Sequence, residues 1–276
     1  GSFQVTDELK VKGAWGKYHQ FVNRVVREDV TQGSRDFWIL ADGETNPISS
    51  AEHRIFGISF ETDGWLLDGE FFEKDMRGLS EFSLRFQSAL GTGSNDQYFF
   101  EGTGIARGVE FLVQKKLGTY TGWLGYTLSE VVHSFADISD APFYALHDQR
   151  HEFKWVNMLK MGNWDLGATW VYGSGKPYTA PDGEYTITLL DGSTYEYVSV
   201  GDKNGLRLPA YHRLDVSATY TFKLGGGMGS TGLSLFNLYN RKNIWYKEFE
   251  VVEDDLIETN VNYIGFTPSI FFNVKF

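Results

Sequence analysis

The sequence has no cysteine among its 276 residues. This absence excludes disulfide bonds, thiolate metal sites and cysteine nucleophiles together. It also has no run of about eighteen apolar residues, and its mean hydropathy is −0.30, so no membrane-spanning helix is expected. Cations are scarce, since 25 Lys and Arg stand against 36 Asp and Glu. The resulting formal net charge of −11 argues against nucleic acid as a partner.

Aromatic residues and glycines are abundant instead. Aromatics make up 16% of the chain, and 31 glycines stand against 6 prolines. A transmembrane β-barrel needs aromatic girdles and tight turns, and its strands alternate, so that averaged hydropathy stays low. The composition therefore fits a membrane barrel. The opening residues Gly1–Phe3 lack the charged start and apolar segment of a secretory signal. We therefore expect that the chain begins within a longer protein.

Residues 262–276 show the clearest alternation. One parity carries Ile264, Phe266, Ile270, Phe272, Val274 and the terminal Phe276. The other parity is polar or small, with Phe271 as the exception. A period of two predicts a strand with one apolar face. About ten residues of tilted strand cross a bilayer. The alternative is an edge strand of a soluble β-sandwich.

Ten such segments follow one another along the chain. They are residues 8–20, 53–62, 65–75, 104–116, 119–129, 150–161, 164–172, 211–222, 231–240 and 262–276. Tight turns are expected at Asp63–Gly64, Leu117–Gly118, Gly162–Asn163 and Gly225–Gly229. Long connections are expected at residues 21–50, 76–98, 132–147, 173–209 and 241–261.

Short and long connections thus alternate. An antiparallel transmembrane barrel with short periplasmic turns and long extracellular loops has this pattern. If the first strand runs from the periplasm to the outside, the tenth runs back to the periplasm. Phe276 then lies on the periplasmic side. The connection at residues 21–50 is polar and irregular. Residues 82–86 are expected to form a short strand, and residues 185–198 a hairpin turned at Asp191–Gly192.

Several segments resemble the C-terminal barrel of TonB-dependent outer-membrane receptors. They are residues 102–128, Asp148–His151, Leu208–Asp215 and Phe236–Asn243. Trp38–Asp42 and Leu79–Phe86 are similar to Bacteroidota members. The resemblance implies about 22 strands around a plug. It implies import of a scarce nutrient (siderophore, haem, cobalamin, glycan or peptide) across the Gram-negative outer membrane, with energy from TonB–ExbB–ExbD. It also implies that barrel-assembly machinery reads the terminal Phe276.

About ten strands are only half of such a barrel. Residues 1–276 are therefore expected to be a C-terminal barrel portion without a plug domain. The expected partners are the remaining barrel and the plug, in the same protein or in a second chain. A surface lipoprotein is a further expected partner, as in some Bacteroidota importers. Whether the chain is a fragment, a nicked receptor or one chain of a two-chain barrel stays open.

Polar residues on the alternating strands supply candidates for the lumen. Glu110, Arg213 and Asp215 lie on polar faces and are expected to line it, as a structural network rather than a transport path. Arg107 falls on the apolar parity, where a residue near the membrane boundary can snorkel. Aromatics in the expected outer loops are candidate ligand contacts or girdle residues. They are Trp38, Tyr178, Trp245 and Tyr246.

Catalytic and cofactor chemistry finds little support. Gly227, Gly229 and Gly232 match a dinucleotide fingerprint by letter, but the following residues are strand-like instead of helical. If His147 and His151 share a strand, they are about 13 Å apart, too far for one metal ion. If His147 lies in the preceding loop, the spacing does not constrain the pair, and both are expected to be ordinary strand-end histidines. Glu253–Asp255 lacks the ligand spacing of a calcium loop. No catalytic residue, cofactor or metal is predicted.

Two other classes remain as alternatives. A self-contained barrel could carry a hydrolase site at its rim, with His133, His147 or His212 as candidates, although no paired acidic group is evident. An adhesive barrel scaffold is the third class. The import receptor is the preferred interpretation.

Overall fold

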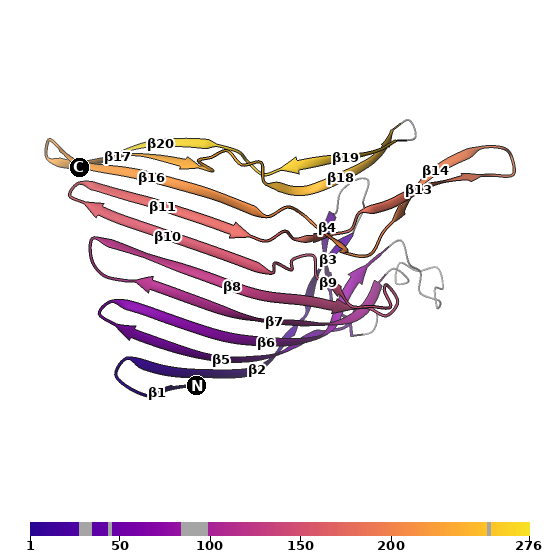
Figure 1. Cartoon of the computed structure of the whole chain (residues 1–276), viewed down its shortest axis with the longest axis horizontal. Helices are drawn as coiled ribbons and strands as arrows, with labels where there is room; N and C mark the ends of the chain where they lie inside the picture. The colour runs from indigo at the N-terminus through magenta and orange to yellow at the C-terminus, as the bar shows by residue number, and fades with distance from the viewer. Residues whose placement is uncertain (28–34, 44–45, 84–98, 253–254) are drawn as a thin grey trace.

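The computed structural model describes residues 1–27, 35–43, 46–83, 99–252 and 255–276. Within these ranges the chain consists of strands and connections, without a helix. One antiparallel sheet runs in the order β1-β2-β5-β6-β7-β8-β10-β11-β16-β17-β20 (Figure 1). Its strands are β1 (Ser2–Gln4), β2 (Leu9–Gln20), β5 (Ser49–Thr62), β6 (Trp65–Phe82), β7 (Phe99–Lys115), β8 (Tyr120–Ser134), β10 (His151–Met161), β11 (Trp164–Gly173), β16 (Tyr211–Leu224), β17 (Gly227–Phe236) and β20 (Thr267–Lys275). None of the described segments forms a helix of the length and apolarity that crossing a membrane requires.

The tight turns lie together at one end of this sheet (Figure 1, left). They are residues 63–64, 116–119, 162–163 and 225–226. Each contains a glycine with a positive φ, such as 58° at Gly162 and 57° at Gly225, a conformation that costs other residues energy. All four turns were predicted. The last is shorter than expected, because β17 begins at Gly227 instead of 231.

The connections at the opposite end hold more structure than the sequence suggested. Residues 21–50 were expected to be irregular, which is wrong, because they form the hairpin β3 (Val22–Arg27) and β4 (Arg35–Leu40). Residues 241–261 were expected to be a loop, which is also wrong, because β18 (Ile244–Val252) pairs with β19 (Asp255–Asn262). Both hairpins are rich in charged residues, which masked their alternation.

Other elements at this end fit the expectation more closely. The hairpin around Asp191–Gly192 is confirmed as β13 (Pro181–Thr188) and β14 (Thr194–Val200). Short pairs add β9 (Phe143–Tyr144) to β8, and β12 (Pro177–Tyr178) to β15 (Leu206–Arg207).

Several strand boundaries differ from the prediction. The strand β6 runs on to Phe82 instead of ending near residue 75, and β8 runs on to Ser134. A register shift between Arg77 and Leu79 lets β6 continue its pairing with β7. The last strand, β20, covers nine residues, because residues up to 262 belong to β19. The expected strand at 82–86 falls mostly outside the described residues.

The two faces of the sheet have opposite chemistry. Phe60, Leu67 and Val113 lie side by side on β5, β6 and β7. This parity is exposed, and Ile270 and Phe272 near the end of the chain are 81% and 63% accessible. Exposed apolar surface of this extent marks a membrane or partner contact, and it does not fit a soluble sandwich, which would bury one face of the sheet.

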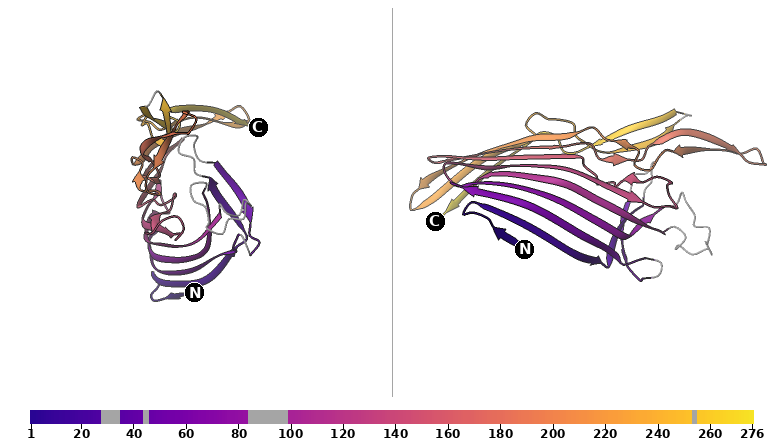
Figure 2. Two further views of the ribbon diagram at one scale, coloured as in Figure 1. Left: turned by 90° about the vertical axis from the view of Figure 1, so that its right-hand side faces the viewer. Right: turned by 60° about the horizontal axis from the view of Figure 1, so that its bottom comes forward.

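Polar residues occupy the other parity. Lys12 bonds Asp68 at 2.8 Å and also pairs with Glu70, and Glu70 lies directly opposite Glu110. Figure 2 shows the sheet bent into an open arc, with β3 and β4 on its inner side. On this side a buried cluster of Phe100, Phe135, Ile138 and Phe143 packs at the long-connection end.

Candidate functional site

A cavity of about 270 Å³ lies between β3 and the ends of β6 and β8, and we call it the hairpin cavity. The hairpin β3–β4 is held over the sheet by Val25, which is 1% exposed, and by Phe37, whose ring meets those of Phe82 and Phe99 at 5.4 and 6.3 Å. The cavity therefore depends on a connection that was expected to be irregular.

His133 and His147 both line this cavity, with ring centroids 6.1 Å apart. His133 lies beyond the charged pair Arg107–Glu130 (2.9 Å), which sits on the exposed parity, so we place it outside the membrane-spanning part of β8. Burial lowers the pKa of His133 to about 4, helped by His147 and Lys203.

Burial also lowers the pKa of His147, and Lys176 and Lys74 add to this, while Asp148 opposes it. Both imidazoles are therefore neutral at pH 7.

Hydrogen-bonding groups in the hairpin cavity are only partly satisfied. Asn23 is 7% exposed, and its Oδ1 accepts a bond of 3.0 Å from Ser49. Its Nδ2 has no partner among the described residues, and neither has Oγ of Ser80. Lys203 and Glu81 form an ion pair of 2.6 Å, in which their side chains are 10% and 19% exposed. Buried donors without partners are rare and point to an occupant such as a ligand or water.

A second cavity, of about 280 Å³, lies among β10, β11, β16 and the base of β18. Arg213 and Trp245 both line it. The Trp245 ring lies 5.8 Å from that of Tyr263, and Tyr246 meets Trp245 at 5.0 Å. Tyr178 lies near the same hairpin, since Lys247 is 5.4 Å from the centre of its ring.

Of the four predicted aromatic contacts, Trp245 and Tyr246 therefore lie together, and Tyr178 lies against the same hairpin. Trp38 does not join them, because it lies on β4 and is 66% exposed. Ligand contact by these residues stays a prediction.

Glu110, Arg213 and Asp215 lie on the same face of the sheet, as the polar parity indicated. Arg213 donates to Asp215 at 2.9 Å and to the hydroxyl of Tyr211 at 2.7 Å. Asp215 also accepts the backbone N–H of Asn237 at 2.9 Å. Arg213 and Asp215 thus hold the β17–β18 connection in place.

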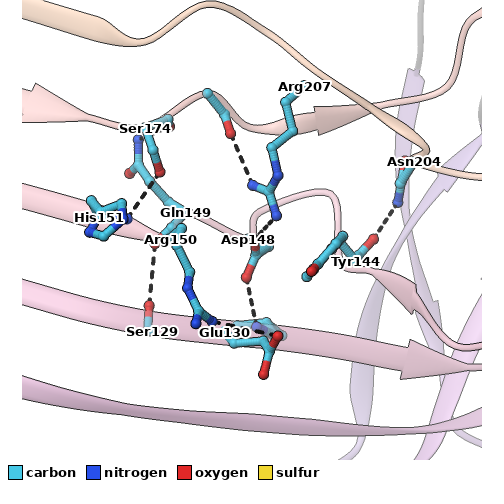
Figure 3. Close-up of polar contacts among 12 residues, drawn as sticks. Ser129, Glu130, Tyr144, Asp148, Gln149, Arg150, His151, Ser174, Asn204 and Arg207 are labelled. Carbon is cyan, nitrogen blue, oxygen red and sulfur yellow. Dashed lines mark hydrogen bonds and ion pairs between the residues drawn. The ribbon is translucent and has the colours of Figure 1, made fainter.

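The segment Asp148–His151 anchors two long connections to each other (Figure 3). Asp148 is fully buried, accepts the N–H of Val131 at 2.7 Å and pairs with Arg207 at 2.5 Å. Arg207 also donates to the carbonyl of Gly175 at 3.0 Å. This segment carries part of the family resemblance, and its contacts give it a structural role.

Asn237 forms a second anchor. It is fully buried with φ of 50°, its Nδ2 donates to the carbonyl of Arg241 at 2.9 Å, and its Oδ1 accepts the N–H of Arg241 at 3.1 Å. Asn243 bonds both backbone groups of His212 at 3.0 Å. The spacing Asn237, Asn240, Asn243 was the available signal, since asparagine caps turns with its side chain.

Histidines elsewhere do not form a catalytic group. His151 bonds Tyr126 at 2.9 Å and His212 bonds Tyr239 at 2.7 Å, so neither reaches His133 or His147. The glycines at 227–232 lie in β17, without a helix to bind a pyrophosphate. Among the described residues, no group of three or more His, Asp or Glu could hold a metal ion. Glu253–Asp255 lies largely outside the described residues.

Solved structures that share this fold include receptors for iron complexes. The ferripyoverdine receptor of Pseudomonas aeruginosa superposes with a TM-score of 0.60 at 9% identity, over 98% of this chain and 31% of that chain. BauA, the ferric preacinetobactin receptor of Acinetobacter baumannii, gives 0.58 at 12%, over 98% and 34%. Fiu, the ferric-catecholate import receptor of Escherichia coli K12, gives 0.59 at 13%, over 98% and 33%.

At these identities the likeness shows the fold alone, and the chain spans about a third of the length of these receptors. A comparison with curated proteins gave no match. The family model described as TonB dependent receptor-like, beta-barrel matches residues 2–240, so the chain belongs to the TonB-dependent receptor β-barrel family.

Proposed function

We propose that the chain is the C-terminal barrel portion of an outer-membrane receptor that imports a scarce nutrient with TonB-derived energy. The observation that carries the proposal is the antiparallel strand order, with the four tight turns between its long strands at one end and an exposed apolar parity. Membership in the receptor family supports it. A receptor that transports its ligand without catalysis is part of the same proposal.

The proposed partners follow from the shape of the sheet. The sheet is an open arc, and lipid requires every edge to be paired. The remaining barrel strands would pair with its edges, and a plug would fill the lumen against polar residues such as Glu110 and Lys12. TonB–ExbB–ExbD would act through that plug. A surface lipoprotein over the long connections is a further proposed partner.

Two residue-level roles belong to the same proposal. Phe276 is 97% exposed at the tight-turn end and would be the signal for barrel-assembly machinery. Trp245 would contact ligand in the second cavity, with Tyr246 beside it on β18 and Tyr178 on β12. Trp38 would act from β4.

Cysteine labelling tests the orientation, because the chain has no cysteine of its own. Leu190 is fully exposed at the tip of the β13–β14 hairpin, and Asn163 lies in a tight turn. The test uses the two single variants Leu190→Cys and Asn163→Cys. In intact cells a membrane-impermeant maleimide should label residue 190 at once, and residue 163 only after permeabilisation. Equal labelling of both in intact cells would refute the membrane orientation.

Uptake tests the transport step. Cells that carry the receptor should accumulate the nutrient, and deletion of TonB should abolish accumulation while surface binding persists. Accumulation at the same rate without TonB would overturn the energy-coupled proposal.

A further inference from the structure

The atoms left unpaired in the hairpin cavity belong to groups that can donate hydrogen bonds. They are the amide Nδ2 of Asn23 and the hydroxyl of Ser80, and both are buried. Each unsatisfied donor in such a place costs about 1–3 kcal/mol. The neutral rings of His133 and His147 add one N–H each. A ligand that fits this cavity therefore brings hydrogen-bond acceptors.

The remaining walls are apolar. Leu79, Phe135, Phe143 and Leu146 line the same cavity, and the rings of Phe135 and Phe143 stack at 6.0 Å. A small hydrated ion would not make van der Waals contacts with these apolar walls. The cavity of about 270 Å³ would then lose that dispersion energy. The occupant therefore has an apolar body as well as an acceptor group.

Charge selects an anion over a metal ion. The charged residues that line the cavity are Arg24, Lys203 and Glu81, a net of one positive charge. Arg24 pairs with Asp36 and Lys203 with Glu81, so the negative charges of Asp36 and Glu81, which would otherwise repel a carboxylate, are each compensated by a cation. A divalent cation would find two imidazoles close to Lys203, and no third His, Asp or Glu completes the set among the described residues.

We propose that the hairpin cavity binds an organic carboxylate with an aromatic or otherwise apolar body. Its oxygens accept hydrogen bonds from Asn23 and Ser80, and its body lies against Phe135 and Phe143. This proposal gives the ligand class of the receptor proposed above, and it rests on that proposed function. Its binding test does not require transport.

Proton uptake accompanies binding. His133 is faced by His147, Lys203, Glu81 and Arg24, and its pKa is low because burial and positive neighbours disfavour its charged form.

His147 is faced in addition by Asp148, Lys176 and Lys74. A bound carboxylate adds a negative charge beside both rings and raises their pKa. Affinity for the carboxylate therefore increases as pH falls from 7 towards 5.

Benzoate and benzamide form a matched pair of probes, equal in size and different in charge. Calorimetric titration of the purified protein in detergent at pH 6 should show saturable benzoate binding, with benzamide about tenfold weaker, equivalent to about 1.4 kcal/mol. Equal affinity for both, or no saturation with benzoate, would overturn the proposal.

Variants locate the site. Asn23→Asp keeps the acceptor used by Ser49 and puts a carboxylate where the amide donor was, so benzoate binding should weaken at least tenfold. Ser80→Ala should weaken it several-fold. Asn163→Asp adds the same charge at a distant turn and should change nothing. Unchanged binding in Asn23→Asp would refute the assignment.

The wild-type protein provides a test that no folding defect can disturb. Benzoate should raise the titration midpoints of His133 and His147, read from their ring proton resonances, and a midpoint that stays fixed counts against the proposal. Lost binding with intact TonB-dependent uptake would reject the carboxylate site alone. Intact binding with TonB-independent uptake would reject the import function alone.

Discussion

The two ends of the sheet hold their hairpins by different means. At the tight-turn end, turns of two to four residues rely on backbone conformation, with positive φ at Gly64, Gly118, Gly162 and Gly225. At the other end, connections of over a dozen residues are held by buried side chains such as Asp148 and Asn237. Backbone-driven turns are local and can be read from short motifs, whereas side-chain anchors join segments that are far apart in sequence.

Removing the carboxylate of Asp148 should do the most damage to the long-connection end. Asp148→Ala leaves the N–H of Val131 and the guanidinium of Arg207 without their partner, which costs about 3–4 kcal/mol after allowance for the partly exposed Arg207. Urea unfolding in lipid vesicles should show this loss. Asp148→Asn keeps one acceptor and should cost less, and a neutral Asp148→Ala would contradict the anchor.

Removing the side chain of Asn237 should cause the second largest loss of stability. Asn237→Ala removes both side-chain bonds to Arg241 and puts alanine at φ of 50°, together about 2–3 kcal/mol. Asn237→Gly accepts the same φ and should recover about 1 kcal/mol of it. The same unfolding assay compares the two, and equal stability would show that backbone strain contributes nothing here.

Acid should loosen the long-connection end selectively. The folded pKa of His133 is about 4, below its ordinary 6.5, so the unfolded chain binds more protons between these values. The contribution of His133 to the free energy of unfolding is therefore fully present above pH 6.5. It falls by about 2 kcal/mol by pH 5. Hydrogen exchange in β3 and β8 should accelerate at pH 5, and His133→Gln should reduce the acceleration, leaving the smaller part that His147 contributes. Uniform acceleration at both ends would contradict this assignment.

The tight turns should show the smallest effect. Gly162→Ala meets no atom within 4 Å but must adopt φ of 58°, so it should cost about 1 kcal/mol. Gly226→Ala is the control, because it too has open space and its φ is not in the left-handed region. Equal unfolding midpoints for the two variants would argue against a conformational cost at residue 162.

Alternation and turn chemistry predicted the strand order, because each long strand pairs with the next long strand along the chain. Asp63–Gly64 and Gly162–Asn163 encode their turns in two residues. The hairpin β3–β4 could not be predicted, since it depends on the burial of Val25 and on Phe37 packing against β6 and β7, far along the chain.

The candidate site was predicted only in part. The sequence offered His133 and His147 as candidates for a hydrolase site at the barrel rim, which is a different chemistry. Nothing near them in sequence pointed to Asn23 or Ser80. Their meeting depends on β3 folding over β8, which is a tertiary event.

Because each long strand pairs with the next one along the chain, a whole hairpin can be lost or duplicated in evolution without disturbing the other strands. Loss of β10 and β11 together would leave β8 and β16 antiparallel, free to pair directly with no reversal of any other strand. Duplication of a hairpin would widen the arc in the same way. A gene could therefore change the girth of such a barrel in steps of two strands, with the remaining strands keeping their directions and faces.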